Sequence, residues 1–128
     1  MRKNIYGERS LDYAISLNNL ALIYYKMGAL NDAADLFSEA LAIKKETLPE
    51  IHGQISIGYF NLGLVYDKLH RDNEALENYR DSMEIDNELG AYEDVLLTAE
   101  YVAEIYERND MPEEAEAYRT LCSEDDEH

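Results

Sequence analysis

An internal repeat constrains this chain more than any other feature of its sequence. The segment Asn19–Tyr24 (Asn-Leu-Ala-Leu-Ile-Tyr) returns forty-two residues later as Asn61–Tyr66, and a weaker copy follows forty residues after that at Tyr101–Tyr106. Repeats of about 20 to 50 residues indicate an array in which each unit packs on its neighbours. A chain of 128 residues is too short for two independent cores, so the sequence predicts one short array.

Within each unit the apolar residues have helical spacing. Leu17, Leu20, Ala21 and Tyr24 recur at intervals of three and four residues, which predicts an amphipathic helix with these side chains in the core. Gly28 follows, where a left-handed residue can end that helix. The same pattern predicts six helices and no strand, with first helices near residues 10–27, 53–69 and 92–108 and second helices near 31–47, 72–88 and 112–122.

Small residues occupy matching places in the three units. Ala21, Gly63 and Ala103 take the same position in each copy of the repeated segment. A small side chain there lets two helices approach closely. We therefore expect a larger side chain at Gly63 to overpack the core.

These motifs resemble the tetratricopeptide repeat, in which large-x2-Leu-(Gly/Ala)-x2-Tyr is followed by Ala-x3-aromatic. The period of forty-two, with Ser16–Ala21 and Ala40–Lys44, resembles the kinesin light chain type of this repeat. The resemblance implies an all-α fold, a right-handed superhelix of about three helix-turn-helix units. Its boundaries would be a remnant of a preceding repeat at 1–8, repeats at 10–48, 53–89 and 92–122, and an acidic disordered tail at 123–128.

The net charge of −17 lies in the second part of the chain. Residues 1–48 hold six basic and six acidic side chains, so residues 49–128 carry the whole excess of acid. Such a field repels phosphate backbones and anionic lipid, which argues against nucleic acid and membranes as partners. No apolar run is long enough to span a bilayer, and the single cysteine, Cys122, does not ask for an oxidising compartment. We therefore expect a cytoplasmic protein.

Signatures of enzymes and metal sites are missing from the sequence. It contains no glycine-rich phosphate loop, no His-Glu-x-x-His and no Gly-x-Ser-x-Gly. The three histidines, His52, His70 and His128, are far apart in the chain. We therefore predict no catalytic residue, no metal site and no cofactor.

The resemblance places a peptide-binding groove on the concave wall formed by the first helices. Asn19 and Asn61 would hydrogen-bond the backbone of a bound peptide, or alternatively bridge helices of their own array. Glu100, Glu104 and Glu107 share one helical face, which is either a solvated face or an acidic pocket for a partner's Lys or Arg. The predicted groove residues are Asn18, Asn19, Leu22, Tyr25, Lys26, Phe60, Asn61, Leu64, Asp67, Lys68, Glu100, Glu104 and Glu107.

Three functions remain open at this level. The first is a protein-interaction scaffold that binds a peptide segment, with basic and apolar residues, in the groove and does no chemistry. The second is a structural role, as part of a longer solenoid or as a homodimer through exposed edge helices. The third is a regulatory domain that senses a peptide.

Overall fold

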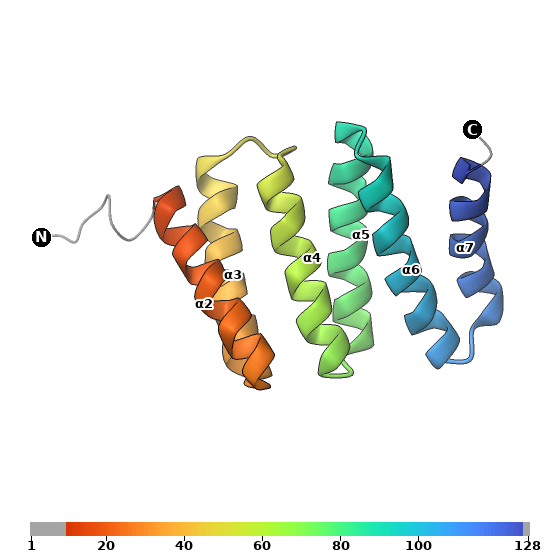
Figure 1. The fold of residues 1–128 in the computed structure, drawn as a ribbon, viewed down its shortest axis with the longest axis horizontal. Coiled ribbons are helices and arrows are strands. Elements are labelled where there is room, and N and C mark those ends of the chain that lie inside the picture. Colours follow the sequence, from red (N-terminus) through yellow and green to blue (C-terminus); the bar gives the residue numbers. More distant parts are fainter. Residues whose placement is uncertain (1–9, 127–128) are drawn as a thin grey trace, which may run out of the picture.

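The computed structural model describes residues 10–126, with side chains as far as Leu121, and holds six helices and no strand in that part of the chain (Figure 1). Three antiparallel pairs follow one another, and each helix packs against the next along the chain. The all-α repeat superhelix predicted from the sequence is confirmed. The helices are α2 (Leu11–Met27), α3 (Leu30–Thr47), α4 (Gly53–Lys68), α5 (Asp72–Leu89), α6 (Tyr92–Arg108) and α7 (Pro112–Asp126).

The long period of the repeat is accommodated in long helices of 15 to 18 residues joined by short connections. Five of the six helices end within one residue of the predicted position. The last one, α7, continues to Asp126, four residues past the end predicted at 122, because no glycine or proline follows Pro112 to interrupt it. The predictions for residues 1–8 and for 127–128 lie outside the described residues.

A left-handed residue follows each of α2, α4, α5 and α6, as the glycine after α2 suggested. Gly28 has φ 86° and Gly90 has φ 76°, and both lie directly after a helix. His70, which takes the place of Gly28 in the second repeat, has φ 61°, and Asp110 has φ 63°. These four turns reverse the chain through the same backbone conformation whether or not glycine supplies it. The turn after α3 differs, because Leu48 is extended there, with φ −119°.

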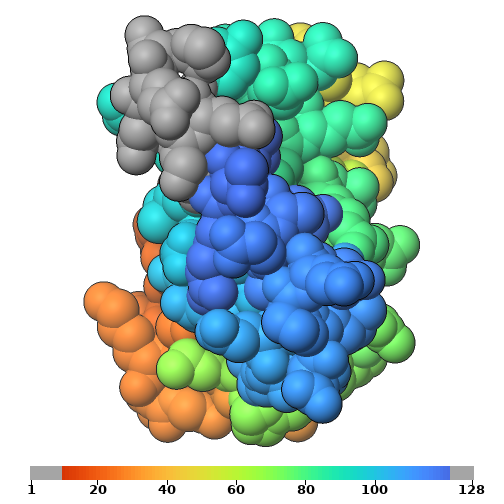
Figure 2. Space-filling model, turned by 90° about the vertical axis from the view of Figure 1, so that its right-hand side faces the viewer, coloured from red at the N-terminus to blue at the C-terminus, as the bar shows by residue number. Residues whose placement is uncertain are grey.

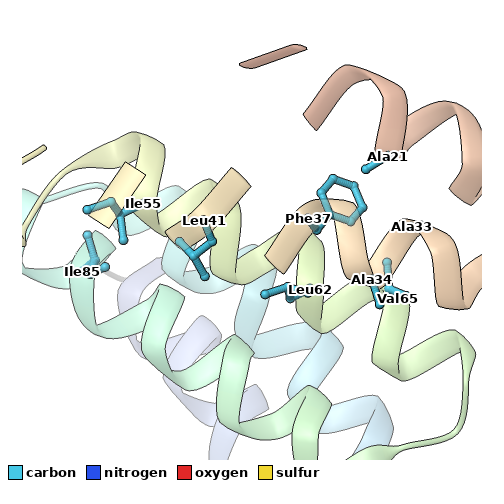
Figure 3. Packing of buried hydrophobic residues seen from close by; sticks show 9 residues of the cluster. All are labelled: Ala21, Ala33, Ala34, Phe37, Leu41, Ile55, Leu62, Val65 and Ile85. Atoms are coloured by element: carbon cyan, nitrogen blue, oxygen red, sulfur yellow. The ribbon is translucent and has the colours of Figure 1, made fainter. Parts of the chain in front are cut away.

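Clusters of buried apolar residues lie between the helices. Phe37 of α3 is buried beside Ala21, and Leu62 and Val65 of α4 belong to the same cluster (Figure 3). In the next repeat Tyr79 takes the place of Phe37 and is fully buried with residues of α6. A cluster of this kind at each junction fixes the spacing of the pairs along the array.

Gly63 of α4 lies directly against the Tyr79 ring of α5 in that core. A Cβ at this position would lie 2.5 Å from two ring carbons of Tyr79. The expectation that this position must be small is therefore confirmed by the geometry of the second repeat.

One predicted core residue is exposed. Leu20 is 41% exposed, whereas Leu62, its counterpart in the second repeat, is 5% exposed. The prediction for Leu20 was wrong because of where α2 lies in the array. The helix α4 packs against α3 on one side and α5 on the other, while the outer side of α2 meets no described helix (Figure 1). At the other end of the array α7 is the helix that faces outward, and Figure 2 looks directly onto it.

Candidate functional site

Side chains from all three first helices meet around one hollow of about 370 Å³. We call it the groove hollow. Five of its six lining residues belong to the groove predicted from the sequence, so the structure brings together residues that are up to 79 positions apart (from 25 to 104). The lining residues are Tyr25 of α2, Leu64, Asp67 and Lys68 of α4, and Tyr101 and Glu104 of α6.

An aromatic cluster holds one wall of the groove hollow in place. The ring of Tyr101 stacks on Tyr79 with centroids 5.7 Å apart and meets Phe60 edge-on at 5.5 Å. Tyr79 and Phe60 are also in contact, at 5.7 Å. Such pairs favour one mutual orientation, so Tyr101 is positioned from both α4 and α5.

Two tyrosines of this region, Tyr25 and Tyr79, stay protonated at neutral pH because their pKa values are raised. Burial raises the pKa of Tyr25, and the nearby Tyr101 and Asp67 raise it further. Burial also raises the pKa of Tyr79, whose hydroxyl donates to Asp67 Oδ2 at 3.4 Å. The hydroxyl of Tyr25 is therefore available to the groove as a neutral donor and acceptor.

Asp67 is paired within the protein. Arg108 Nη2, at the end of α6, lies 2.8 Å from Asp67 Oδ1 and 2.6 Å from Asp72 Oδ1. Asn109 donates to the other oxygen of Asp72 at 2.7 Å. These contacts tie α6 to α4 and α5, and Asp67 shares the positive charge of Arg108 with Asp72.

The three glutamates of α6 have two different environments. Arg119 of α7 lies 3.4 Å from Glu100 and 3.2 Å from Glu107, while Glu104 lines the groove hollow. Glu100 and Glu107 are thus partnered by the protein's own arginine. Of the acidic face predicted from the sequence, Glu104 alone lies in the groove hollow.

The asparagines also differ from one another. Asn61 is 9% exposed, whereas Asn19, its counterpart on α2, is exposed. Asn18 is half-buried, and its Oδ1 has no hydrogen-bond donor among the described residues. The difference follows from position, because α4 is covered on both sides and α2 on one. Leu22 and Lys26 are exposed on α2, as is Lys68 on α4.

The two histidines in the described part of the chain lie at the two ends of α4. His52 caps α4, and its Nδ1 accepts a hydrogen bond from the backbone N–H of Gln54 at 3.0 Å. His70 ends the same helix in the left-handed conformation. In residues 10–126 no three His, Cys, Asp or Glu side chains come together in a way that could hold a metal ion. The same residues include no helix long and apolar enough to cross a membrane.

Comparison with known sequences decides the family. Models described as tetratricopeptide repeat match residues 1–46 and residues 58–89. The chain belongs to the tetratricopeptide repeat family. Its repeats are of the kinesin light chain type, since it is 35% identical over 65 residues to the Arabidopsis thaliana protein KINESIN LIGHT CHAIN-RELATED 2. It is also 39% identical over 49 residues to Protein HGV2 of Halocynthia roretzi.

These relatives are much longer proteins. The matched segments are 51% and 38% of the present chain and 10% of each relative. The part of this tetratricopeptide repeat chain that matches therefore spans about a tenth of the length of each of these curated relatives.

Solved structures show the same arrangement of helices. BtubC (BKLC) from P. vanneervenii superimposes with a TM-score of 0.85 at 22% identity, covering 91% of this chain and 48% of that one. A Podosopora anserina putative kinesin light chain gives 0.79 at 20% identity, covering 95% and 60%. The repeats and this architecture support a role in protein–protein interaction.

Proposed function

We propose that this array binds an extended peptide segment of a partner protein along its first helices, and that the groove hollow is the centre of that site. The observation that carries the proposal is the meeting of α2, α4 and α6 around one hollow that holds both apolar and polar side chains. Concave surfaces of stacked helix pairs commonly bind peptides in this way.

The chemistry of the groove hollow suits one apolar or aromatic side chain of the peptide. Leu64 and the rings of Tyr25 and Tyr101 offer an apolar wall, and Lys68 and Glu104 lie at its edge. Asn61, largely buried on the neighbouring turn, has amide groups that can pair with a peptide backbone. The partner would thus provide an apolar anchor on a hydrogen-bonded extended chain.

The charge of the array favours a partner segment with basic residues. The net charge is −17, and complementary charge speeds association and makes it sensitive to salt. We expect the array to act by binding alone, without catalysis, and in the cytoplasm.

A structural role is the second candidate, because the outer side of α2 exposes apolar side chains. Ile15 is 40% exposed, Ile23 54% and Met27 71%, and they recur every four or eight residues along one side of the helix. Another repeat or a second copy of the chain could pack there. Light scattering separates the two candidates: a monomer that binds peptide supports the groove, and a tight dimer that no longer binds peptide supports the structural role.

A peptide library tests the groove directly. Random 12-residue peptides are selected on the wild-type chain, and their affinities are measured by fluorescence anisotropy. Glu104→Arg, an exposed change in the groove hollow, should weaken the selected peptides about tenfold, whereas Glu116→Arg, an exposed change on α7, should not. Equal affinities for both variants and the wild type would reject the groove as the binding site.

A further inference from the structure

A second hollow lies between α4 and α6, nearer the N-terminal ends of both helices. It measures about 310 Å³, room for about ten waters at roughly 30 Å³ each, and residues of α5 form its floor. We call it the second hollow. Its lining includes Ile57 and Phe60 of α4, Asp86 and Leu89 of α5, and Asp94 and Leu97 of α6.

The second hollow opens on the same face as the groove hollow. Ile57 and Leu64 are seven residues apart on α4, and Leu97 and Glu104 are seven residues apart on α6. Seven residues make about two turns of an α-helix, so each pair lies on one side of its helix. The contact between Phe60 and Tyr101 joins a residue of one hollow to a residue of the other and lies between them.

A buried carboxylate is the main polar group of the second hollow. Asp86 is 7% exposed, and its Oδ1 accepts a hydrogen bond from Ser56 Oγ at 2.6 Å. Ser56 Oγ lies 2.8 Å from Ser82 Oγ, so Ser82 can donate to Ser56 while Ser56 donates to Asp86. No basic side chain of the described residues forms an ion pair with Asp86.

The electrostatic environment of Asp86 favours a nearby cation. Burial raises the pKa of its carboxyl group, the hydrogen bond from Ser56 opposes that shift, and the nearby Asp94 raises the pKa further. A buried charge that has a neutral donor but no cation is costly. A positive group placed between Asp86 and Asp94 would remove that cost.

The fold of the repeat does not require this polar floor. Forty-two residues earlier, the first repeat has Ala14 and Ala40 where the second has Ser56 and Ser82, and both alanines are fully buried. The same helix pair is thus built with two buried alanines beside a buried lysine, Lys44, in one repeat and with a hydroxyl and carboxylate network in the next.

Apart from the exposed Asp94, the rim of the second hollow is mainly apolar. Ile57 and Leu89 are each 46% exposed, and Leu97 is 53% exposed. An apolar rim above a buried carboxylate matches a side chain with a long hydrocarbon stem and a positive end. Lysine and arginine are the side chains with that chemistry.

We propose that the second hollow binds a Lys or Arg side chain of the same peptide segment whose apolar anchor occupies the groove hollow. The stem packs against Ile57 and Leu97, and the charged end lies beside Asp86. This inference rests on the proposed peptide groove and adds a register to it. Seven helical residues span about 10 Å, which an extended peptide covers in about three residues. The basic residue therefore lies about three positions from the apolar anchor.

The experiment uses the full chain and the 12-residue peptides selected on the wild type. Each peptide is compared with a version in which its basic residue is replaced by methionine, on the wild type and on Asp86→Asn. Glu88→Gln, an exposed change on the same helix, is the control for a loss of one negative charge. The basic residue should be worth about tenfold in affinity on the wild type and on Glu88→Gln, and at most twofold on Asp86→Asn.

Three results overturn the inference. If the methionine peptides lose equal affinity on Asp86→Asn and on the wild type, the basic residue is bound elsewhere. If selected peptides depend on Glu104 but carry no basic residue near the anchor, the second hollow is not part of the site and the proposed function stands. If no peptide depends on Glu104, the proposed function fails and the inference fails with it.

A second variant protects the test against misfolding. The thermal midpoint of Asp86→Asn is measured by circular dichroism, and if it drops sharply, Asp94→Asn replaces it, since Asp94 is exposed. On that variant, the affinity gained from the basic residue, relative to methionine, should be about threefold smaller than on the wild type. If the affinity gained from the basic residue were the same on Asp94→Asn as on the wild type, the inference would be contradicted.

Discussion

The first and second repeats share a backbone plan but differ at the positions that matter most for packing and charge. Ala21 and Phe37 meet in the first repeat where Gly63 and Tyr79 meet in the second. Lys44 is buried in the first where Asp86 is buried in the second. The comparison shows that one helical spacing accommodates different packing and opposite buried charges in the two repeats.

The largest expected effect concerns the small position of each repeat. Gly63→Leu should lower the free energy of unfolding by about 2 kcal/mol or more, because even a Cβ would lie 2.5 Å from the Tyr79 ring. Gly63→Ala should destabilise as well, although alanine favours a helix by about 1 kcal/mol.

The counterpart in the first repeat supplies the control. Ala21→Gly should also destabilise, by about 1 kcal/mol, because Phe37 packs on the methyl group. Urea unfolding measures all three variants. A Gly63→Ala variant more stable than the wild type would show that the second repeat is not packed more closely than the first.

The hydroxyl and carboxylate network is the next largest difference. Ser56→Ala removes the donor to the buried Asp86 and should cost about 2 kcal/mol, the usual scale for a hydrogen bond to a charged group. Ser16→Ala, at an exposed position of α2, should leave stability unchanged. Adding Asp86→Leu to Ser56→Ala should recover stability, since it removes the buried carboxylate that Ser56→Ala leaves without its donor. If Ser56→Ala and Ser16→Ala had the same free energy of unfolding, the network would not contribute to stability.

The buried charges of the two repeats should respond to pH in opposite directions. Burial lowers the pKa of Lys44, so the unfolded chain binds that proton more tightly, and the cost of the buried charge is relieved as the pH rises toward about 10.4, the unfolded value. Lys44→Met should therefore raise the thermal midpoint by a few degrees at pH 7, and the gain should shrink as the pH approaches 10.

For Asp86 the sign is reversed. Burial raises its pKa, so the folded protein binds the proton more tightly, and the cost is relieved as the pH falls toward about 3.9. The stability of Asp86→Asn relative to the wild type should thus decrease between pH 7 and pH 4. Thermal midpoints of the wild type, Lys44→Met and Asp86→Asn are measured from pH 4 to pH 10. If the difference from the wild type changed with pH in the same direction for both variants, the comparison would be contradicted.

The smallest effect concerns the turn after each first helix. His70 has φ 61° where Gly28 has φ 86°, and an L-residue pays to adopt this conformation. His70→Gly should stabilise by a few tenths to about 1 kcal/mol, because the relief of strain exceeds the added freedom of the unfolded chain. Gly28→Ala should destabilise by a similar amount. A neutral result for both would show that the turns bear no strain.

The periodicity of the sequence was enough to predict the helices and most of the groove hollow. Residues such as Tyr25, Leu64 and Glu104 could be found because the groove repeats with the helices. Exposure could not be read in this way, as Leu20 and Asn19 show. Equivalent positions differ when one helix lies at the end of the array and the other inside it.

The second hollow was missed for a different reason. It needs Ser56, Ser82 and Asp86 from two helices, and none of them stands out in the sequence alone. A signal was present nonetheless, because superimposing the first repeat on the second sets alanines against both serines. The pairing of Glu100 and Glu107 with Arg119 depends on how α7 packs, which spacing along α6 does not reveal.

The central claim is that the face formed by α2, α4 and α6 binds peptide, and a titration followed by nuclear magnetic resonance tests it most directly. A 12-residue peptide selected on the wild type is added to the ¹⁵N-labelled chain, and the shifts of the backbone amides are mapped on the helices. We expect the largest shifts along α4 and α6, at Ile57, Leu64, Leu97, Tyr101 and Glu104, with small shifts along α3 and α7. Shifts concentrated on α3, α7 or the outer side of α2 would contradict the account.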